Sequence, residues 1–200
     1  MQARLLRAAV TILAVLSVPA VALAHTGAGP ASGFGHGFGH PLGGLDHILA
    51  MVMVGVFAWQ LGGRALWLVP ASFVVVMAVG GALGMAGIGV PFVEVGIALS
   101  VIVLGAVVAF GVKAPLAVAM GMVGLFAIFH GHAHGAEMPE GAGGLAYAAG
   151  FILATALLHA AGIGVGFAIG RFGERFGPTV VRAAGAFSAL AGVGLLAGVL

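Results

Sequence analysis

The sequence contains no cysteine, and this absence removes several functions at once. Without thiols the chain forms no disulfide, no thiolate metal site and no cysteine nucleophile. Charge is also scarce, since only 6% of the residues are Asp, Glu, Lys or Arg. The one lysine, Lys113, stands in no G-x-x-x-x-G-K-[ST] loop, and the chain has no H-E-x-x-H motif. These absences argue against nucleotide-driven chemistry and a zincin-type protease, and nothing indicates a nucleic-acid partner.

Most of the sequence is apolar. Hydrophobic residues make up 62% of the chain and the mean hydropathy is +1.25, both typical of an integral membrane protein. Six apolar segments are each about long enough to cross a bilayer: 41–61, 65–86, 91–111, 115–134, 145–170 and 178–200. Many of the 37 glycines recur within them at spacings of three or four, which favours close helix packing. We therefore predict an all-α membrane protein, with a six-helix transmembrane domain over residues 40–200.

Two segments precede this domain. Residues 1–24 read as a cleavable signal peptide, with Arg4 and Arg7, an apolar stretch and an A-x-A site at 22–24, although an uncleaved first helix is the alternative. Residues 25–39 form a Gly- and His-rich segment that contains GFGH at 33–36 and most of a second copy at 37–40. We expect it to be a flexible periplasmic arm. Its histidines, His25 and His36, either gather metal at the surface or are simply solvated.

The basic residues predict the orientation. A cleaved signal leaves the mature N-terminus outside, and six crossings then place the first, third and fifth connections in the cytoplasm. All the basic residues of the mature chain lie in those three connections or near the start of the last helix: Arg64, Lys113, Arg171, Arg175 and Arg182. This agrees with the positive-inside rule. It places the histidine-rich ends of the first and fourth helices at the periplasmic face.

The first of these ends contains His40, Asp46 and His47. The apolar run 48–61 is too short at about 1.5 Å per residue for a core of roughly 30 Å, so we expect the helix to begin near Pro41. Asp46 and His47 then lie at the interface, where ionisable groups usually have a function. His40 and His47 would share a face. Asp46 would bind a metal directly, orient an imidazole, or only favour the helix start.

The second end contains His130, His132, His134 and Glu137. In a continuous helix His130, His134 and Glu137 share a face, whereas His132 points elsewhere and is the weakest candidate. Imidazole and carboxylate together suit a transition metal better than calcium or magnesium. The alternative is a histidine-rich loop that is merely solvated.

Two isolated polar residues complete the candidate set. Glu94 falls in the first turn of the third helix, where it either contacts an ion or is stabilised by the helix dipole. His159 lies near the middle of the fifth helix. It is either a relay point on a permeation path or a histidine hydrogen-bonded between helices.

These residues carry a resemblance to a known family. Residues 40–47, HPLGGLDH, are similar to the H-P-x-x-G-x-D-H motif of the HupE/UreJ family of bacterial nickel and cobalt permeases, and residues 129–137, FHGHAHGAE, are similar to its F-H-G-x-A-H-G-x-E motif. Glu94 resembles a polar position in the family's middle helix. The size, the signal and the six later helices also agree with this family.

The resemblance implies a protein of the bacterial cytoplasmic membrane that takes up Ni²⁺, or Co²⁺ in some members, for hydrogenase or urease maturation. The ion would be cargo, and no permanently bound cofactor is expected. The metal contacts that it implies are His40, Asp46, His47, His130, His134 and Glu137. The residues themselves add Glu94 as a further candidate and His132, His36 and His159 as weaker ones. Two alternatives stay open: a zinc-dependent intramembrane hydrolase that uses the same cluster, and a periplasmic metal buffer without conduction. Apart from the ion and the lipid bilayer, no partner is indicated, and the oligomeric state, including a homo-oligomer, stays open.

Overall fold

The computed structural model describes residues 30–139, 141–171 and 177–200. The predicted signal peptide, His25 and Arg175 lie outside these residues. Within them the chain forms seven α-helices and no strand, which confirms the all-α prediction. The helices are α2 (Pro30–Gly43), α3 (Leu45–Leu61), α4 (Ala65–Met85), α5 (Val93–Ala109), α6 (Leu116–Ala136), α7 (Gly144–Gly170) and α8 (Gly177–Leu196).

All six predicted apolar segments are helical, but they do not all have the length of a membrane span. Helices α4, α6, α7 and α8 are long and apolar enough to cross a bilayer, and α2 with α3 passes as a pair bent by 83°. Helix α5 is apolar but has only 17 residues, because it starts after Pro91 and Phe92 and ends before Gly111, whose φ of 66° turns the chain. The chain is thus a multi-pass helical membrane protein. Among its described residues four or five helical segments qualify as spans by length and composition, so the predicted six crossings are not confirmed.

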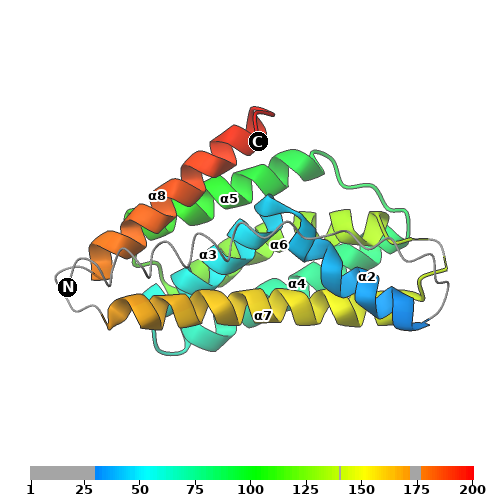
Figure 1. Cartoon of the computed structure of the whole chain (residues 1–200), viewed down its shortest axis with the longest axis horizontal. Helices are drawn as coiled ribbons and strands as arrows, with labels where there is room; N and C mark the ends of the chain where they lie inside the picture. Colours follow the sequence, from blue (N-terminus) through cyan, green and yellow to red (C-terminus); the bar gives the residue numbers. More distant parts are fainter. Residues whose placement is uncertain (1–29, 140, 172–176) are drawn as a thin grey trace, which may run out of the picture.

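The predicted flexible arm is wrong for its described part. From Pro30 the chain is helical, and α2 lies against α7 (Figure 1). The repeated glycines explain why: a Cβ at Gly33 or Gly37 would collide with the backbone carbonyl of Ala142 or Tyr147. Glycine at every fourth position therefore lets two helices touch. This packing outweighs the low intrinsic helix propensity of glycine.

The predicted helix start near Pro41 is also wrong. Pro41 lies inside α2, and the chain breaks at Gly44, whose extended backbone separates α2 from α3. A Cβ at Gly44 would lie 2.5 Å from Oδ1 of Asp46, so glycine leaves room for that carboxylate at the start of α3. Consequently His40 and His47 lie on two different helices and not on one face.

Close glycine contacts also set the packing of the other helices. Helix α4 packs extensively on α6, α8 runs beside α5, and α3 packs on α7 (Figure 1). Gly80 faces the α6 backbone, and Gly55 and Gly162 pair α3 with α7, as the glycine spacing indicated, whereas Gly121 faces open space. The buried core between these helices includes Met51, Phe57, Phe73, Met77 and Leu104.

Candidate metal centre

The start of α3 holds a carboxylate paired with an imidazole. Oδ1 of Asp46 accepts hydrogen bonds from the backbone N–H of His47, at 2.7 Å, and from its Nδ1, at 2.8 Å. The positive end of the helix dipole favours a carboxylate at this place. Because an ionised carboxylate only accepts, Nδ1 of His47 carries the hydrogen, and in the neutral ring Nε2 keeps a lone pair. That Nε2 is buried and has no partner among the described residues.

The end of α6 supplies two buried imidazoles. As predicted, the helix continues through the histidine-rich stretch and ends at Ala136, so His130 and His134 lie one turn apart. The exposed fractions of these residues are 0% and 1%. Glu137 follows at the helix end and is exposed. A solvated histidine loop is therefore not what the structure shows.

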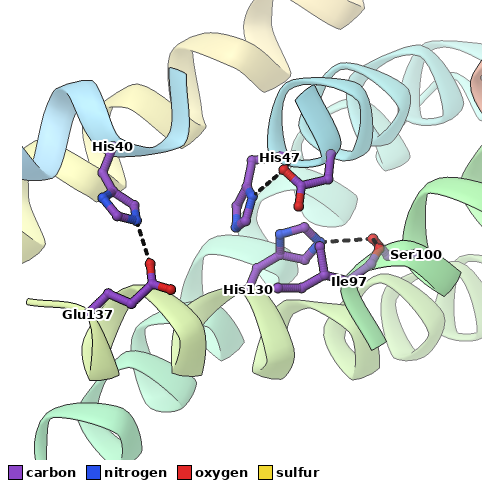
Figure 2. A network of polar contacts seen from close by, with 7 residues as sticks. His40, His47, Ile97, Ser100, His130 and Glu137 are labelled. Atoms are coloured by element: carbon purple, nitrogen blue, oxygen red, sulfur yellow. Dashed lines mark hydrogen bonds and ion pairs between the residues drawn. The ribbon is translucent and has the colours of Figure 1, made fainter. Parts of the chain in front are cut away.

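Four imidazoles from α2, α3 and α6 form one row. Its consecutive ring centroids are 4.7 Å apart for His40 and His134, 4.4 Å for His134 and His47, and 4.7 Å for His47 and His130. At the outer end, Nε2 of His40 lies 2.8 Å from Oε2 of Glu137 (Figure 2). We call these four rings the histidine row. Helix α2 thus contributes to the row even though it is separate from α3.

A cavity of about 400 Å³ opens onto this row. Three carboxylates line it, from Asp46, Glu94 and Glu137, together with His40, His47 and backbone at Gly39, Gly43 and Gly44. Glu94 lies in the first turn of α5, where the sequence placed it. The cavity therefore brings acidic side chains from α3, α5 and the end of α6 to the mouth of the row.

All three weaker candidates lie outside the row. His36 is exposed on α2, and Nε2 of His132 is 2.9 Å from the carbonyl oxygen of Ile88, in the connection between α4 and α5. His159 is buried on α7, with neither ring nitrogen partnered among the described residues. Its ring packs edge-on against the ring of Phe73, with the centroids 5.1 Å apart. The centroid of the Phe73 ring also lies 5.7 Å from that of His130. Phe73 thus contacts both His159 and His130 of the row.

Besides Phe73, sequence reasoning missed three side chains that lie close to the row. The Oγ of Ser100 lies 2.8 Å from Nε2 of His130. The ring of Phe151 packs on that of His134 with the centroids 4.2 Å apart, and the ring centroids of Tyr147 and His40 are 6.4 Å apart. Ser100 carries one signal that could have been used. It follows Gly96 by four residues, so a small residue and a small polar residue share one face of α5.

The row is not a preformed coordination sphere. In the part of the chain that the structure describes, no three His, Asp or Glu side chains are arranged to hold one metal ion. The imidazoles instead pack edge to face, with interplanar angles of 63° to 88°. Their chemistry, neutral nitrogen donors beside carboxylates, suits transition metals. An ion would have to separate the rings in order to bind between them.

The fold and this site define a class: a multi-pass helical membrane protein with buried histidines beneath a carboxylate-lined cavity. The chain belongs to the HupE/UreJ protein family, whose family model matches residues 13–195. It is 52% identical over 188 residues to Protein HupE of Rhizobium leguminosarum bv. viciae, an alignment that covers 94% of this chain and 96% of that protein. No solved structure is significantly similar to it. These matches confirm the resemblance that the two histidine motifs indicated.

Proposed function

We propose that this protein is a permease that imports Ni²⁺, with Co²⁺ as the alternative ion, across the bacterial cytoplasmic membrane to supply hydrogenase or urease maturation. Membership of the HupE/UreJ family supports this proposal, because the resemblance carried by the histidine motifs is to nickel and cobalt permeases. Transport would be facilitated or ion-coupled, since the sequence has no phosphate-binding loop. The protein would not be an enzyme, and the ion would be its cargo.

The histidine row beneath the cavity is the observation that carries the proposal. Carboxylates at the mouth raise the local concentration of a divalent cation. Imidazoles below them replace its water ligands with nitrogen donors that transition metals prefer. Because conduction needs a site that also releases the ion, a row without a rigid three-ligand cage fits a transport site better than a storage site.

The residues around the two ends of α3 differ in charge, and this difference supports an orientation of the protein in the membrane. Asp46 and His47 lie at its start, whereas its other end adjoins a second cavity lined by Gln60, Lys113 and Arg182. Lys113 donates a hydrogen bond to the backbone carbonyl of Gln60. By the positive-inside rule, the basic end faces the cytoplasm. The histidine row and the mature N-terminus would then face the periplasm.

Nickel uptake by cells that express single variants tests this function. His47→Ala and His130→Ala each remove one ring of the row, and both should abolish nickel accumulation above background. His36→Ala is the matched control, because it removes an exposed histidine of α2 that lies outside the row. Unchanged accumulation in both row variants, at equal membrane expression, would refute the permease.

One contact favours the zinc hydrolase as a second candidate. The bond between Asp46 and His47 is the carboxylate–histidine arrangement that zinc sites often use to orient a ligand. A catalytic site of this kind would retain zinc through purification and conduct no ion. Purified protein in liposomes that enclose a metal-sensitive dye separates the two. Nickel entry supports the permease, whereas stoichiometric zinc without flux supports the hydrolase.

A further inference from the structure

Ser100 makes two short hydrogen bonds in the interior of the protein. Its exposed fraction is 0%, and its Oγ lies 2.6 Å from the carbonyl oxygen of Ile97 and 2.8 Å from Nε2 of His130 (Figure 2). A hydroxyl has only one hydrogen to donate, and a carbonyl oxygen only accepts. The hydrogen of Ser100 is therefore used on Ile97. The hydroxyl oxygen must accept the second bond, so Nε2 of His130 carries a hydrogen.

This assignment determines the other nitrogen of the His130 ring. In a neutral imidazole only one nitrogen is protonated, so Nδ1 of His130 keeps its lone pair. That Nδ1 is buried without a hydrogen-bond partner among the described residues. A doubly protonated ring would instead bury an unpaired cation, which is costly. The His130 ring thus keeps one nitrogen lone pair that is free to bind a metal ion. Its centroid lies 4.7 Å from that of the His47 ring.

We propose that Ser100 is a positioning residue that holds His130 in its Nε2–H tautomer, so that Nδ1 is the atom offered to the transported ion. Asp46 acts on the neighbouring ring in the same way and leaves Nε2 of His47 free. The two adjacent rings therefore offer opposite nitrogens. The part that concerns the ion rests on the proposed function, whereas the tautomer of His130 does not.

The packing of α5 explains how a short side chain reaches His130. One turn before Ser100, a Cβ at Gly96 would collide with the ring of Phe129, the residue that precedes His130. Glycine there lets α5 approach α6 closely. Gly96 and Ser100 lie on the same face of α5, so this approach brings the hydroxyl within hydrogen-bond distance of the imidazole.

Ser72 makes the same bond to its own helix as Ser100 but has no imidazole partner within the described part of the chain, so it serves as a comparison. The hydroxyl of Ser72 on α4 donates to the carbonyl of Val69 at 2.8 Å, and no imidazole contact accompanies that bond in the described structure. Such a bond, three residues back along a helix, satisfies a serine by itself. The contact with His130 is therefore an addition that the serine does not need.

The test compares Ser100→Ala with Ser100→Thr and with the control Ser72→Ala. Full-length protein is purified with isotope-labelled histidine, and nitrogen NMR separates protonated from unprotonated ring nitrogens; a His130→Gln sample identifies the His130 signals. We expect wild type, Ser100→Thr and Ser72→Ala to show His130 protonated at Nε2. Ser100→Ala should shift the proton to Nδ1 or populate both tautomers.

Nickel uptake by the same variants completes the test. Loss of a group that orients a metal ligand lowers metal affinity by about 10- to 100-fold, and we expect a loss of this size for Ser100→Ala, with rescue by Ser100→Thr. A wild-type His130 protonated at Nδ1 would overturn the proposal, even if a variant failed to fold. So would an uptake loss in Ser100→Ala no larger than in Ser72→Ala. If wild type transports no nickel, the proposed function fails, but the tautomer measurement still decides the role of Ser100.

Discussion

The rings of His47 and His134 lie with their centroids 4.4 Å apart and their planes at 63°, although one residue is in the first turn of α3 and the other is in the last turn of α6. This contact joins two histidine motifs that are far apart in the sequence. His134 also touches His40 and Phe151, so it lies at the centre of the row. Both of its ring nitrogens are buried without partners in the described structure. Such groups are costly to bury unless something else binds them.

Gly44→Ala should impair transport through the Asp46–His47 pair. The added Cβ would lie 2.5 Å from Oδ1 of Asp46 and 3.2 Å from Nδ1 of His47, so the carboxylate must shift and the imidazole that it orients must adjust. Because the carboxylate orients that imidazole, we expect nickel affinity to fall about 10- to 100-fold, measured as the concentration that gives half-maximal uptake. Gly43→Ala is the control, since its Cβ would meet nothing within 4 Å. Equal affinities in both variants would contradict the proposed role of the pair.

The His40–Glu137 contact should matter for transport more than for stability. The two side chains are 37% and 57% exposed, and exposed ion pairs contribute at most about 1 kcal/mol to the free energy of unfolding. His40→Ala and Glu137→Ala should therefore leave the melting temperature nearly unchanged. Each should raise the nickel concentration for half-maximal uptake, and the double variant should show less than the sum of the two losses, because the residues act as a pair. Additive losses would show that they act separately.

Much of this arrangement could be predicted from the sequence. The apolar segments gave the order of the six later helices, and helical spacing correctly placed His130 and His134 one turn apart on α6. The length argument failed at Pro41, because it assumed a straight first helix, whereas the chain bends by 83° at Gly44. Composition also failed for α2. Its glycines look flexible in isolation, and only the neighbouring α7 makes them packing residues.

Ser100 shows why part of the site could not be found from one sequence. A single serine in an apolar helix is usually satisfied by a carbonyl of its own helix, as Ser72 is. Its bond to His130 depends on how closely α5 approaches α6. That distance is a property of the packed bundle, and the four-residue spacing of Gly96 and Ser100 does not by itself specify it.

Uptake should decline at acid outside pH, because an imidazole must be unprotonated to bind a metal ion. Protons and metal compete for the same imidazole lone pairs, so acid weakens binding and alkaline pH restores it. Initial rates of nickel uptake between about pH 5 and pH 8 measure this effect. As an internal control, raising the nickel concentration should recover part of the rate at low pH. A rate that does not change across this range would show that no imidazole that takes up a proton above about pH 5 limits uptake.

Gly162→Ala should destabilise the bundle, whereas Gly164→Ala should not. A Cβ at Gly162 would collide with the carbonyl of Val52 and lie 3.0 Å from Cα of Gly55, so α7 would have to move away from α3. The neighbouring Gly164 has open space at the same point. We expect a lower melting temperature and a lower yield of monodisperse protein for Gly162→Ala alone. Equal stability of the two variants would show that the contact between α3 and α7 is not a tight one.

His159 separates a permease from a metal buffer. It is buried beyond Phe73, outside the histidine row, with both ring nitrogens unpartnered among the described residues. If ions pass inward from the row, His159→Ala should reduce nickel flux into liposomes and leave nickel binding to the purified protein near the wild-type value. A buffer needs only the outer row and would tolerate the change. Ser188→Ala is the control for removing a buried, unpartnered polar group, and its flux should stay normal. Normal flux in His159→Ala would mean that this histidine has no part in conduction.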